Sequence, residues 1–298
     1  MLPEELVERF RVAKGDRFRL DRFDPDDTGG LELDKSEARD LLQSGVKRLR
    51  DLQERLFAEK RWAILIVLQA IDTAGKDGTI EHVMSGVNPQ GCTVTSFKAP
   101  SSRELRHDFL WRTTCALPER GEIGIFNRSY YEEVLVVRVH EELLAKQGLP
   151  PACTGKTIWS DRFESIRDFE RHLTRNGTVI LKFFLNLSKD EQRRRFLARI
   201  DEPDKNWKFE PGDLAERQHW DDYQRFYADA IANTASEEAP WHVVPANNKW
   251  FTRLLVAATI VERLERLDPR FPTVDAEARK AMAAARKALL AEDDKRER

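Results

Sequence analysis

Short apolar runs bounded by polar residues recur along the middle of the chain. They lie at residues 63–68, 92–97, 122–126, 178–185 and 241–244. The run at 92–97 alternates, whereas the others are almost continuously apolar, which is typical of strands buried on both faces of a parallel sheet. We therefore expect five strands.

Stretches with apolar residues at helical spacing separate these runs. We expect helices at residues 37–59, from the loop at 75–78 to about 87, around 102–117, and at 130–146, 162–175, 189–200, 214–234 and 248–267. Asp34 or Ser36 is placed to cap the first of them, and Ser188 to cap the helix that follows it. Strands that alternate with helices in this order predict an α/β protein with a parallel sheet covered by helices on both faces.

The ends of the chain differ from this pattern. Residues 1–35 are charged and turn-rich, which predicts an extended arm, and residues 269–298 are rich in Ala, Lys and Arg, which predicts a peripheral helical tail. Residues 36–268 then form one domain. Within it, the Pro-flanked segment 201–211 favours a hinged lid, which we place at about residues 190–235.

Composition limits the class of protein only in part. The 298 residues include 50 Lys and Arg against 52 Asp and Glu, so the net charge gives no indication of a polyanionic partner. No segment has the length or apolar character of a signal peptide or membrane span. Three widely spaced cysteines favour a reduced, cytoplasmic protein, and we expect neither a membrane nor a nucleic-acid partner.

The first strand leads into a short loop that contains glycine and Lys76. A strand, a glycine-containing loop and a helix present backbone amides and a helix N-terminus to an anion, which predicts a phosphate-binding loop. The expected phosphate contacts are Ala74, Gly75, Lys76, Asp77, Gly78 and Thr79. The pattern G-x-x-x-x-G-K-[ST] is matched only in part, with Ala70 at the first glycine and Asp77 at the Ser or Thr. For this stretch alone, an ordinary turn with a chance Gly-Lys pair remains an alternative.

Polar clusters also follow the next two strands, at Lys98 and at residues 127–133. Because the carboxyl ends of parallel strands meet at one edge of the sheet, we expect both clusters beside the phosphate loop. Asp72 with one or both of Glu132 and Glu133 would suit magnesium, and Arg128 would suit a phosphate group. A salt bridge is the alternative for Arg128, and an exposed helix start is the alternative for the two glutamates.

Basic residues are frequent from residue 193 to residue 208. Such a run is usually a solvated helix face, but here it borders the Pro-flanked segment. Several cations on one side of a phosphate loop would suit a donor with many phosphates.

Four stretches resemble the family-2 polyphosphate kinases. They are LQAIDTAGKDGTI at 68–80, FKAPS at 97–101, IFNRSYYEEVLVVRVH at 125–140 and DKNWKF at 204–209, within a resemblance that covers residues 36–268. It implies a three-layer αβα P-loop kinase fold, similar to thymidylate kinase, with a helical lid. It also implies a homodimer or homotetramer.

The resemblance implies magnesium-dependent phosphoryl transfer between inorganic polyphosphate and AMP or ADP, with Mn²⁺ able to substitute and guanine nucleotides as further candidates. The implied catalytic residues are Asp72 and Lys76 of the Walker A segment and Arg128 of the Walker B segment. Lys98, Arg193, Arg199, Lys205 and Lys208 match basic positions near the polyphosphate. The nucleotide would lie near Asn127, Arg128, Tyr131, Glu132 and Glu133, with Asp72 and Glu133 on the metal.

The form of the second motif, Asn-Arg-Ser followed by Tyr-Glu-Glu, resembles the branch of this family that acts on both AMP and ADP. The chain departs from that branch at Ala70, where most members have Gly, and at Glu133, where Asp is common. Two other functions stay open. One is an ATP-dependent nucleoside monophosphate kinase, and the other is a non-catalytic polyanion-binding protein on a kinase-like fold.

Overall fold

The computed structural model describes residues 2 and 4–293, and its centre is a six-stranded sheet in the order β1-β6-β5-β2-β4-β3. The strands are β1 (Arg11–Val12), β2 (Ala63–Gln69), β3 (Cys92–Ser96), β4 (Ile123–Asn127), β5 (Thr178–Asn186) and β6 (Trp241–Pro245). All neighbours are parallel except β1, which runs antiparallel to β6. The predicted α/β class and all five predicted strands are confirmed.

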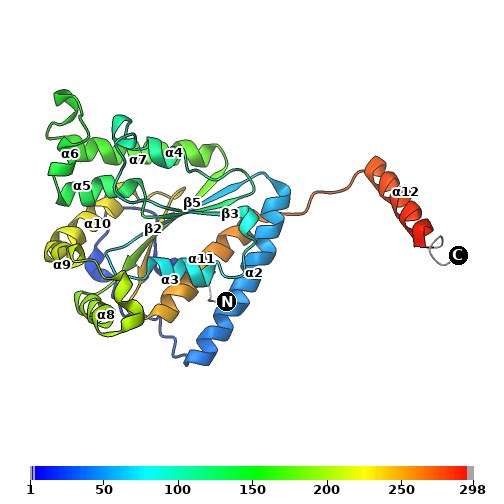
Figure 1. Cartoon of the computed structure of the whole chain (residues 1–298), viewed down its shortest axis with the longest axis horizontal. Helices are drawn as coiled ribbons and strands as arrows, with labels where there is room; N and C mark the ends of the chain where they lie inside the picture. The colour runs from blue at the N-terminus through cyan, green and yellow to red at the C-terminus, as the bar shows by residue number, and fades with distance from the viewer. Residues whose placement is uncertain (1, 3, 294–298) are drawn as a thin grey trace.

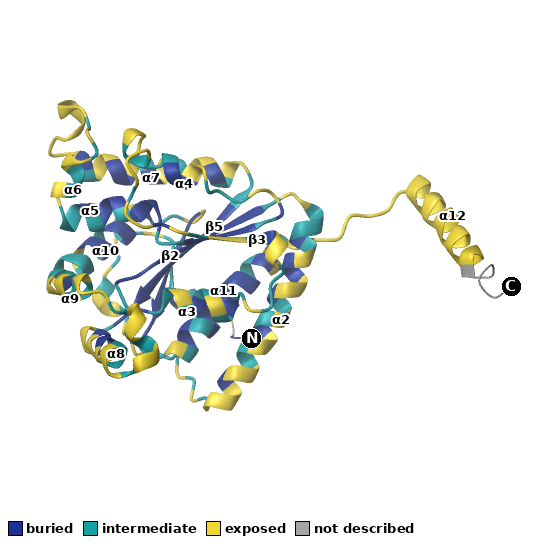
Figure 2. Cartoon of the chain, viewed as in Figure 1, coloured by how far each residue is buried: buried dark blue, intermediate teal, exposed yellow. Residues whose placement is uncertain are grey.

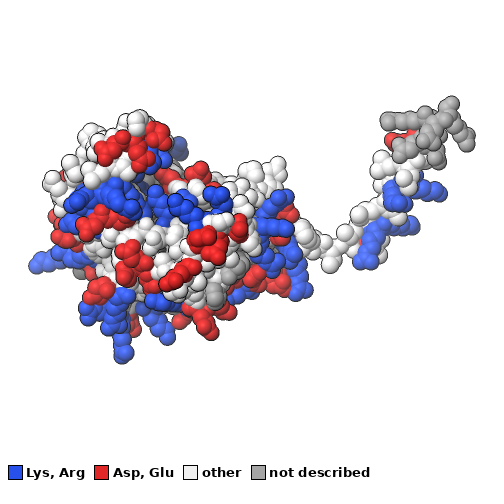
Figure 3. Space-filling view, turned by 90° about the horizontal axis from the view of Figure 1, so that it is seen from below, with Lys and Arg blue, Asp and Glu red and all other residues white. Residues whose placement is uncertain are grey.

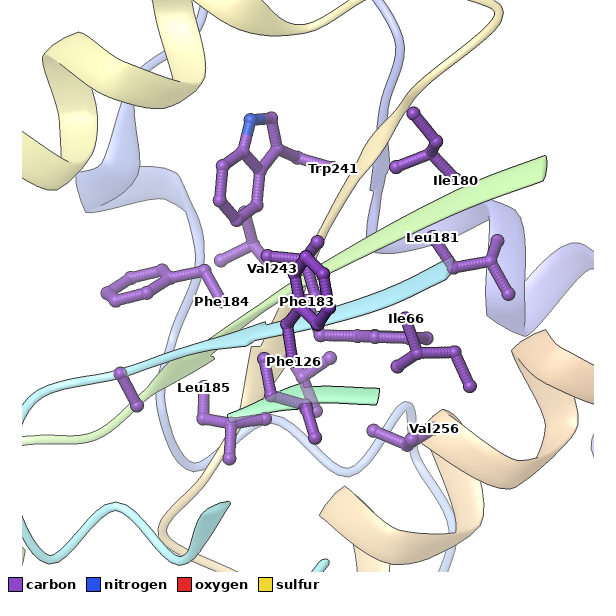
Figure 4. Close-up of a cluster of buried hydrophobic side chains, with 14 of the residues drawn as sticks. Ile66, Phe126, Ile180, Leu181, Phe183, Phe184, Leu185, Trp241, Val243 and Val256 are labelled. Atoms are coloured by element: carbon purple, nitrogen blue, oxygen red, sulfur yellow. The ribbon is translucent and has the colours of Figure 1, made fainter. Parts of the chain in front are cut away.

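Strand β2 is the centre of the sheet. It pairs with β4 on one side and β5 on the other, and all seven of its residues are buried. Continuously apolar strands are required here because helices cover both faces. Figure 4 shows part of the resulting core, in which Trp241 lies on one side of the strands and Val256 lies on the other.

Helices form a layer on each side of the sheet (Figure 1). One layer contains α2 (Lys35–Glu59), α3 (Lys76–Val83) and α11 (Lys249–Leu267), and α11 contacts both of the other helices. The other contains α5 (Val136–Val139), α7 (Ile158–Arg175) and α10 (Trp220–Thr234). Asp34 caps α2 as predicted, through a reciprocal capping box with Glu37. The layers give the predicted three-layer αβα arrangement, and the dark inner surfaces of both layers are visible in Figure 2.

The N-terminal segment is more ordered than the predicted arm. It contains α1 (Glu4–Arg9), β1 and the 3-10 turn η1 (Leu20–Arg22). Val7 and Phe10 are buried, and the Phe10 ring meets the Phe251 ring edge to face at 5.7 Å. An extended arm does not describe this part, because apolar side chains of the charged segment, among them Val7, Phe10 and Val12, are buried in the core.

Two predicted helices are broken into shorter pieces. Residues 130–146 form η4 (Tyr130–Val134), α5 and α6 (Glu142–Ala145), because Leu135, with φ −116° and ψ −85°, interrupts the helix. Residues 102–117 contain only η3 (Glu104–Arg106) and α4 (Trp111–Thr114). Short turns also occur at η2 (Pro89–Gly91) and η5 (Pro151–Cys153).

The region predicted to form the lid, about residues 190–235, contains α8 (Lys189–Asp201), η6 (Pro203–Lys208), α9 (Gly212–Glu216), η7 (Arg217–His219) and α10. Ser188 caps α8, as predicted, by accepting a hydrogen bond from the amide of Glu191. The tail helix α12 (Ala276–Asp293) projects away from the body of the protein (Figure 1). None of the helices in the described part of the chain is both long and apolar enough to cross a bilayer.

A buried polar network joins β5 to the helical layer next to it. The Lys182 Nζ atom donates to Glu170 Oε2 at 2.6 Å, to the Tyr131 hydroxyl at 3.0 Å and to the Thr234 carbonyl at 2.8 Å. The Tyr130 hydroxyl donates to Glu170 Oε1 at 2.9 Å. Burial lowers the pKa of Lys182, and the charge of Glu170 opposes that effect. The network fixes η4, which begins three residues after β4 ends.

Replacing Lys182 with Met should lower the free energy of unfolding by about 3–5 kcal/mol, because it leaves the buried Glu170 carboxylate without its cation. Urea denaturation followed by circular dichroism measures this change. In the double variant with Glu170→Gln as well, part of the loss should return, since no unpaired charge remains. A double variant less stable than Lys182→Met would contradict this account of the network.

Candidate active site

The loop between β2 and α3 has an unusual backbone. Thr73 and Gly75 both have positive φ angles, of 65° and 105°, and Gly75 forms the N-cap of α3. Glycine adopts this conformation without strain, whereas a β-branched threonine does not. The Thr79 amide donates to the Gly75 carbonyl at 2.9 Å, and Ala74 and Thr79 are buried. The predicted strand–loop–helix architecture of a phosphate loop is confirmed, and its strain is typical of functional loops.

Arg128 brings two carboxylates together beside this loop. Its guanidinium donates to Asp72 Oδ1 at 2.8 Å and to Glu132 Oε2 at 3.3 Å. Gln69 Nε2, from the end of β2, donates to Glu132 Oε1 at 3.1 Å. The charges of Glu132 and Asp72 raise the pKa of Arg128, against the effect of burial. We call these three residues, Asp72, Arg128 and Glu132, the charged triad.

Lys76 is half-buried at the start of α3. Its Nζ atom donates to the Ala70 carbonyl at 2.7 Å. Burial lowers the pKa of Lys76 to about 8, and the charge of Arg128 acts in the same direction. The charges of Asp72, Glu132 and Asp77 act in the opposite direction, and a bound phosphate group would add to them.

Asn127 ends strand β4 and points to the phosphate loop. Its Nδ2 atom donates at 2.6 Å to Oδ1 of Asp77, the residue that stands where the phosphate-loop motif has Ser or Thr. The pair joins the end of β4 to the first turn of α3. Gly78, one residue further, lies within reach of Arg253, since a Cβ atom there would be 3.6 Å from its guanidinium.

Glu133 points to a different place from Glu132. Its carboxylate is buried and accepts hydrogen bonds from Arg162 at 3.1 Å and from Gln147 at 2.6 Å. In this arrangement Glu132, and not Glu133, shares Arg128 with Asp72. The predicted metal role of Glu133 therefore does not fit its position, because its charge is already paired in a buried site.

Tyr131 lies in the core. Its side chain is fully buried, and its hydroxyl contacts Glu170, Thr234 and Lys182. Because that ring packs edge to face on Trp241 at 4.7 Å, it has no open surface for a nucleotide. The predicted nucleotide contact at Tyr131 does not fit this buried position, in which the residue supports η4.

A cavity of about 290 Å³ lies next to Glu133. Phe109, Arg112 and Arg162 line it, with the Arg162 guanidinium 5.3 Å from the centre of the Phe109 ring. Arg112 donates to the Lys98 carbonyl at 2.7 Å, which connects the cavity to the segment after β3. Sequence reasoning missed Arg112 and Arg162, because each sits alone in a helical segment without a recognisable motif.

The predicted basic residues of the lid fall into two groups. Arg199 donates to Asp213 at 3.1 Å and to the Lys208 carbonyl at 3.2 Å, and Lys205 pairs with Glu202. Arg193 is exposed and, like Lys98 and Lys208, forms no ion pair with another described residue. The Lys208 ammonium lies 4.9 Å from the centre of the Trp207 ring. Figure 3 shows Lys and Arg interspersed with Asp and Glu on the face that it presents.

Sequence reasoning also missed Arg195. It lies among the exposed basic residues of α8 but is buried, with its guanidinium directed at the phosphate loop. The available signal was Glu191 four residues earlier, at the spacing of a helical ion pair.

A phosphate loop on a parallel sheet, an arginine between two carboxylates and a helical lid together define a phosphate-loop kinase. The model of the family described as "Polyphosphate kinase 2 (PPK2)" matches residues 32–272. The chain therefore belongs to the polyphosphate kinase 2 family.

Individual relatives cover nearly the whole chain. An ADP-polyphosphate phosphotransferase of Rhodopseudomonas palustris is 52% identical over 95% of this chain and 98% of its own length. An AMP/ADP-polyphosphate phosphotransferase of Meiothermus ruber is 48% identical over 89% of this chain and 96% of its own length. The crystal structure of a polyphosphate kinase 2 from Arthrobacter aurescens TC1 matches with a TM-score of 0.85 and 42% identity, over 94% of this chain and 96% of that one.

Phosphate binding by the loop should weaken as the pH rises through about 8, because Lys76 loses its proton there rather than near 10.5. Between these pH values the unfolded chain binds more protons at this lysine than the folded chain, so its contribution to folding stability rises with pH. A loss of phosphate affinity above pH 8 would therefore not result from unfolding caused by the titration of Lys76.

Titration calorimetry with tripolyphosphate at pH 7, 8 and 9 measures the effect. The Lys76→Arg variant is the control, since a guanidinium stays charged throughout this range. Equal pH dependence in the two proteins would exclude Lys76 as its source.

Proposed function

We propose that this protein is a magnesium-dependent polyphosphate:nucleotide phosphotransferase, which transfers the terminal phosphoryl group between inorganic polyphosphate and ADP, AMP or both. The observation that carries the proposal is the charged triad beside the phosphate loop. The names of the relatives from Rhodopseudomonas palustris and Meiothermus ruber support the substrates.

The chemistry requires charge neutralisation and alignment more than covalent help from the protein. Lys76 and Arg128 would bind oxygens of the transferred phosphoryl group. The acceptor oxygen of the nucleotide would then attack phosphorus in line as the bond to the rest of the polyphosphate breaks. The lid would exclude water and so suppress hydrolysis.

Asp72 is the residue best placed to hold Mg²⁺, or Mn²⁺ in its place. Magnesium usually takes only one or two carboxylates, with water and substrate phosphates as its other ligands. No three His, Cys, Asp or Glu side chains form a metal cluster within the described residues, and Asp72 Oδ2 accepts no hydrogen bond from any of them. The residues present therefore fit a metal that arrives with the substrate. When bound, it would neutralise charge on the phosphate oxygens.

The cavity beside Glu133 is our candidate for the nucleotide base and sugar. It combines an aromatic ring, Phe109, with polar groups of Arg112 and Glu133, as small-molecule sites usually do. The exposed Lys98, Arg193 and Lys208, on the loop after β3 and on the lid, are candidates for the polyphosphate. Adenine nucleotides are the proposed acceptors, guanine nucleotides are further candidates, and we propose a cytoplasmic homodimer or homotetramer.

An ATP-dependent nucleoside monophosphate kinase is the rival enzyme. It would need a donor site for a nucleoside triphosphate with magnesium, and Asp77 stands where such loops have Ser or Thr. The Asp77 carboxylate accepts a hydrogen bond from Asn127, so it does not simply take the place of that hydroxyl on the metal. This counts against the rival enzyme.

Incubation with polyphosphate and either AMP, ADP, GMP or GDP, without added ATP, should yield the corresponding product with one more phosphate. Chromatography of the nucleotides measures this product.

Asp72→Asn and Lys76→Ala should each lower kcat/KM at least ~100-fold through lost charge stabilisation. Product formed only when ATP is supplied would favour the rival kinase, and near-normal turnover in both variants would refute the assigned roles.

Truncating Phe109 should weaken the nucleotide and leave polyphosphate binding unchanged. For Phe109→Ala we expect the KM for AMP or ADP to rise about tenfold, in line with the loss of one base–aromatic contact. The KM for polyphosphate, measured in the same assay, is the internal control. An equal rise in both KM values would show that the cavity is not a separate nucleotide site.

A further inference from the structure

The N-terminal half of lid helix α8 is attached to the phosphate loop. Gln192 Nε2 donates to the Asp72 carbonyl at 3.2 Å. One terminal nitrogen of Arg195 donates to the carbonyls of Thr73, at 3.0 Å, and Ala74, at 2.9 Å. Three consecutive loop carbonyls therefore bind side chains of a single helix.

Arg195 also joins the loop to the end of β6. Its second terminal nitrogen donates to the carbonyls of Ala246, at 2.6 Å, and Asn247, at 3.1 Å, and its Nε donates to Glu191 Oε1 at 2.7 Å. A guanidinium has five N–H donors, and these five contacts occupy all of them. Arg195 thus has no donor left for a phosphate group, unlike its exposed neighbour Arg193.

The loop conformation that Arg195 supports is strained. Thr73, a β-branched residue with φ of 65°, is followed after one residue by Gly75 with φ of 105°. In a trans peptide the C=O and N–H groups point in opposite directions. By binding the Ala74 carbonyl, Arg195 therefore directs the Gly75 amide away from itself.

We propose that Arg195 is a positioning residue, which holds the phosphate loop in its strained, anion-binding conformation and attaches it to the lid. The proposal rests on the proposed function for its kinetic part. The guanidinium lies close to the loop, 3.7 Å from where a Cβ of Gly75 would be, yet it acts only through the backbone.

The chain offers a matched control in Arg194. It pairs with the same carboxylate, with Nε 2.6 Å from Glu191 Oε2, but its side chain is 77% exposed and it reaches no loop carbonyl within the described residues. Arg194→Lys and Arg195→Lys thus change the same kind of ion pair on neighbouring residues. Only Arg195→Lys removes a guanidinium that donates to four backbone carbonyls.

Amide hydrogen exchange of residues 70–79 tests the structural part without any substrate. Arg195→Lys should exchange these amides at least about tenfold faster than the wild type, whereas Arg194→Lys should not. In the phosphotransfer assay, Arg195→Lys should lower kcat about 10- to 100-fold, as expected for slight misplacement of reacting groups. Its KM for the nucleotide should stay within about twofold. Guanidinium at low millimolar concentration should partly restore the kcat of Arg195→Ala.

The outcomes separate the two proposals. If the wild type transfers no phosphate but loop exchange responds as expected, the proposed function fails and the positioning role stands. Unchanged exchange, or unchanged kcat in an active enzyme, overturns the role of Arg195. Should Arg195→Lys fail to fold, Glu191→Gln replaces it in both measurements, because it removes the carboxylate that orients the guanidinium. Wild-type behaviour of Glu191→Gln would then overturn the proposal.

Discussion

The parallel pairing of β2 with β4 is the constraint on which the site depends. Leu68 lies opposite Asn127 in that register, so the two strands end within one residue of each other and their following loops begin at the same edge of the sheet. The Arg128 amide then donates to the Leu68 carbonyl at 3.0 Å, while Arg128 has a φ of 63°. This turn of the backbone brings the guanidinium to Asp72. A shift of one residue in the register would direct these side chains to the other face of the sheet.

The site is supported from two directions by buried polar groups. On one side, Lys182 and Glu170 fix η4 and hence Glu132. On the other, Arg195 fixes the phosphate loop from α8. Both supports use a buried cation whose donors are all directed at protein acceptors, which is the condition for a buried charge to be tolerated. The groups of the proposed site differ from these supports. The backbone at Thr73 and Gly75 is in the positive-φ region, and the Arg128 side chain is partly exposed.

Much of the fold followed from local patterns. Apolar runs such as residues 63–68 identify the strands because a strand covered on both faces has no polar side. Asp34 and Ser188 marked the starts of α2 and α8 because capping is a local interaction. The breaks within 102–117 and 130–146 were not predictable in this way. Leu135 interrupts the helix, and Tyr130 and Tyr131 just before it donate hydrogen bonds to Glu170, in a distant part of the chain.

For the site, the sequence alone determined the phosphate loop, Lys76, and the grouping of Asp72 with Arg128, since motif spacing and parallel topology bring them together. Only the tertiary structure decided which of two adjacent glutamates joins them. Glu132 contacts Arg128, whereas Glu133 turns to Arg162, a residue that no local motif connects to it. The same holds within α8, where Arg193 is exposed and Arg195 is buried. Neighbouring residues of one type look equivalent in a sequence, but packing directs their side chains to opposite sides.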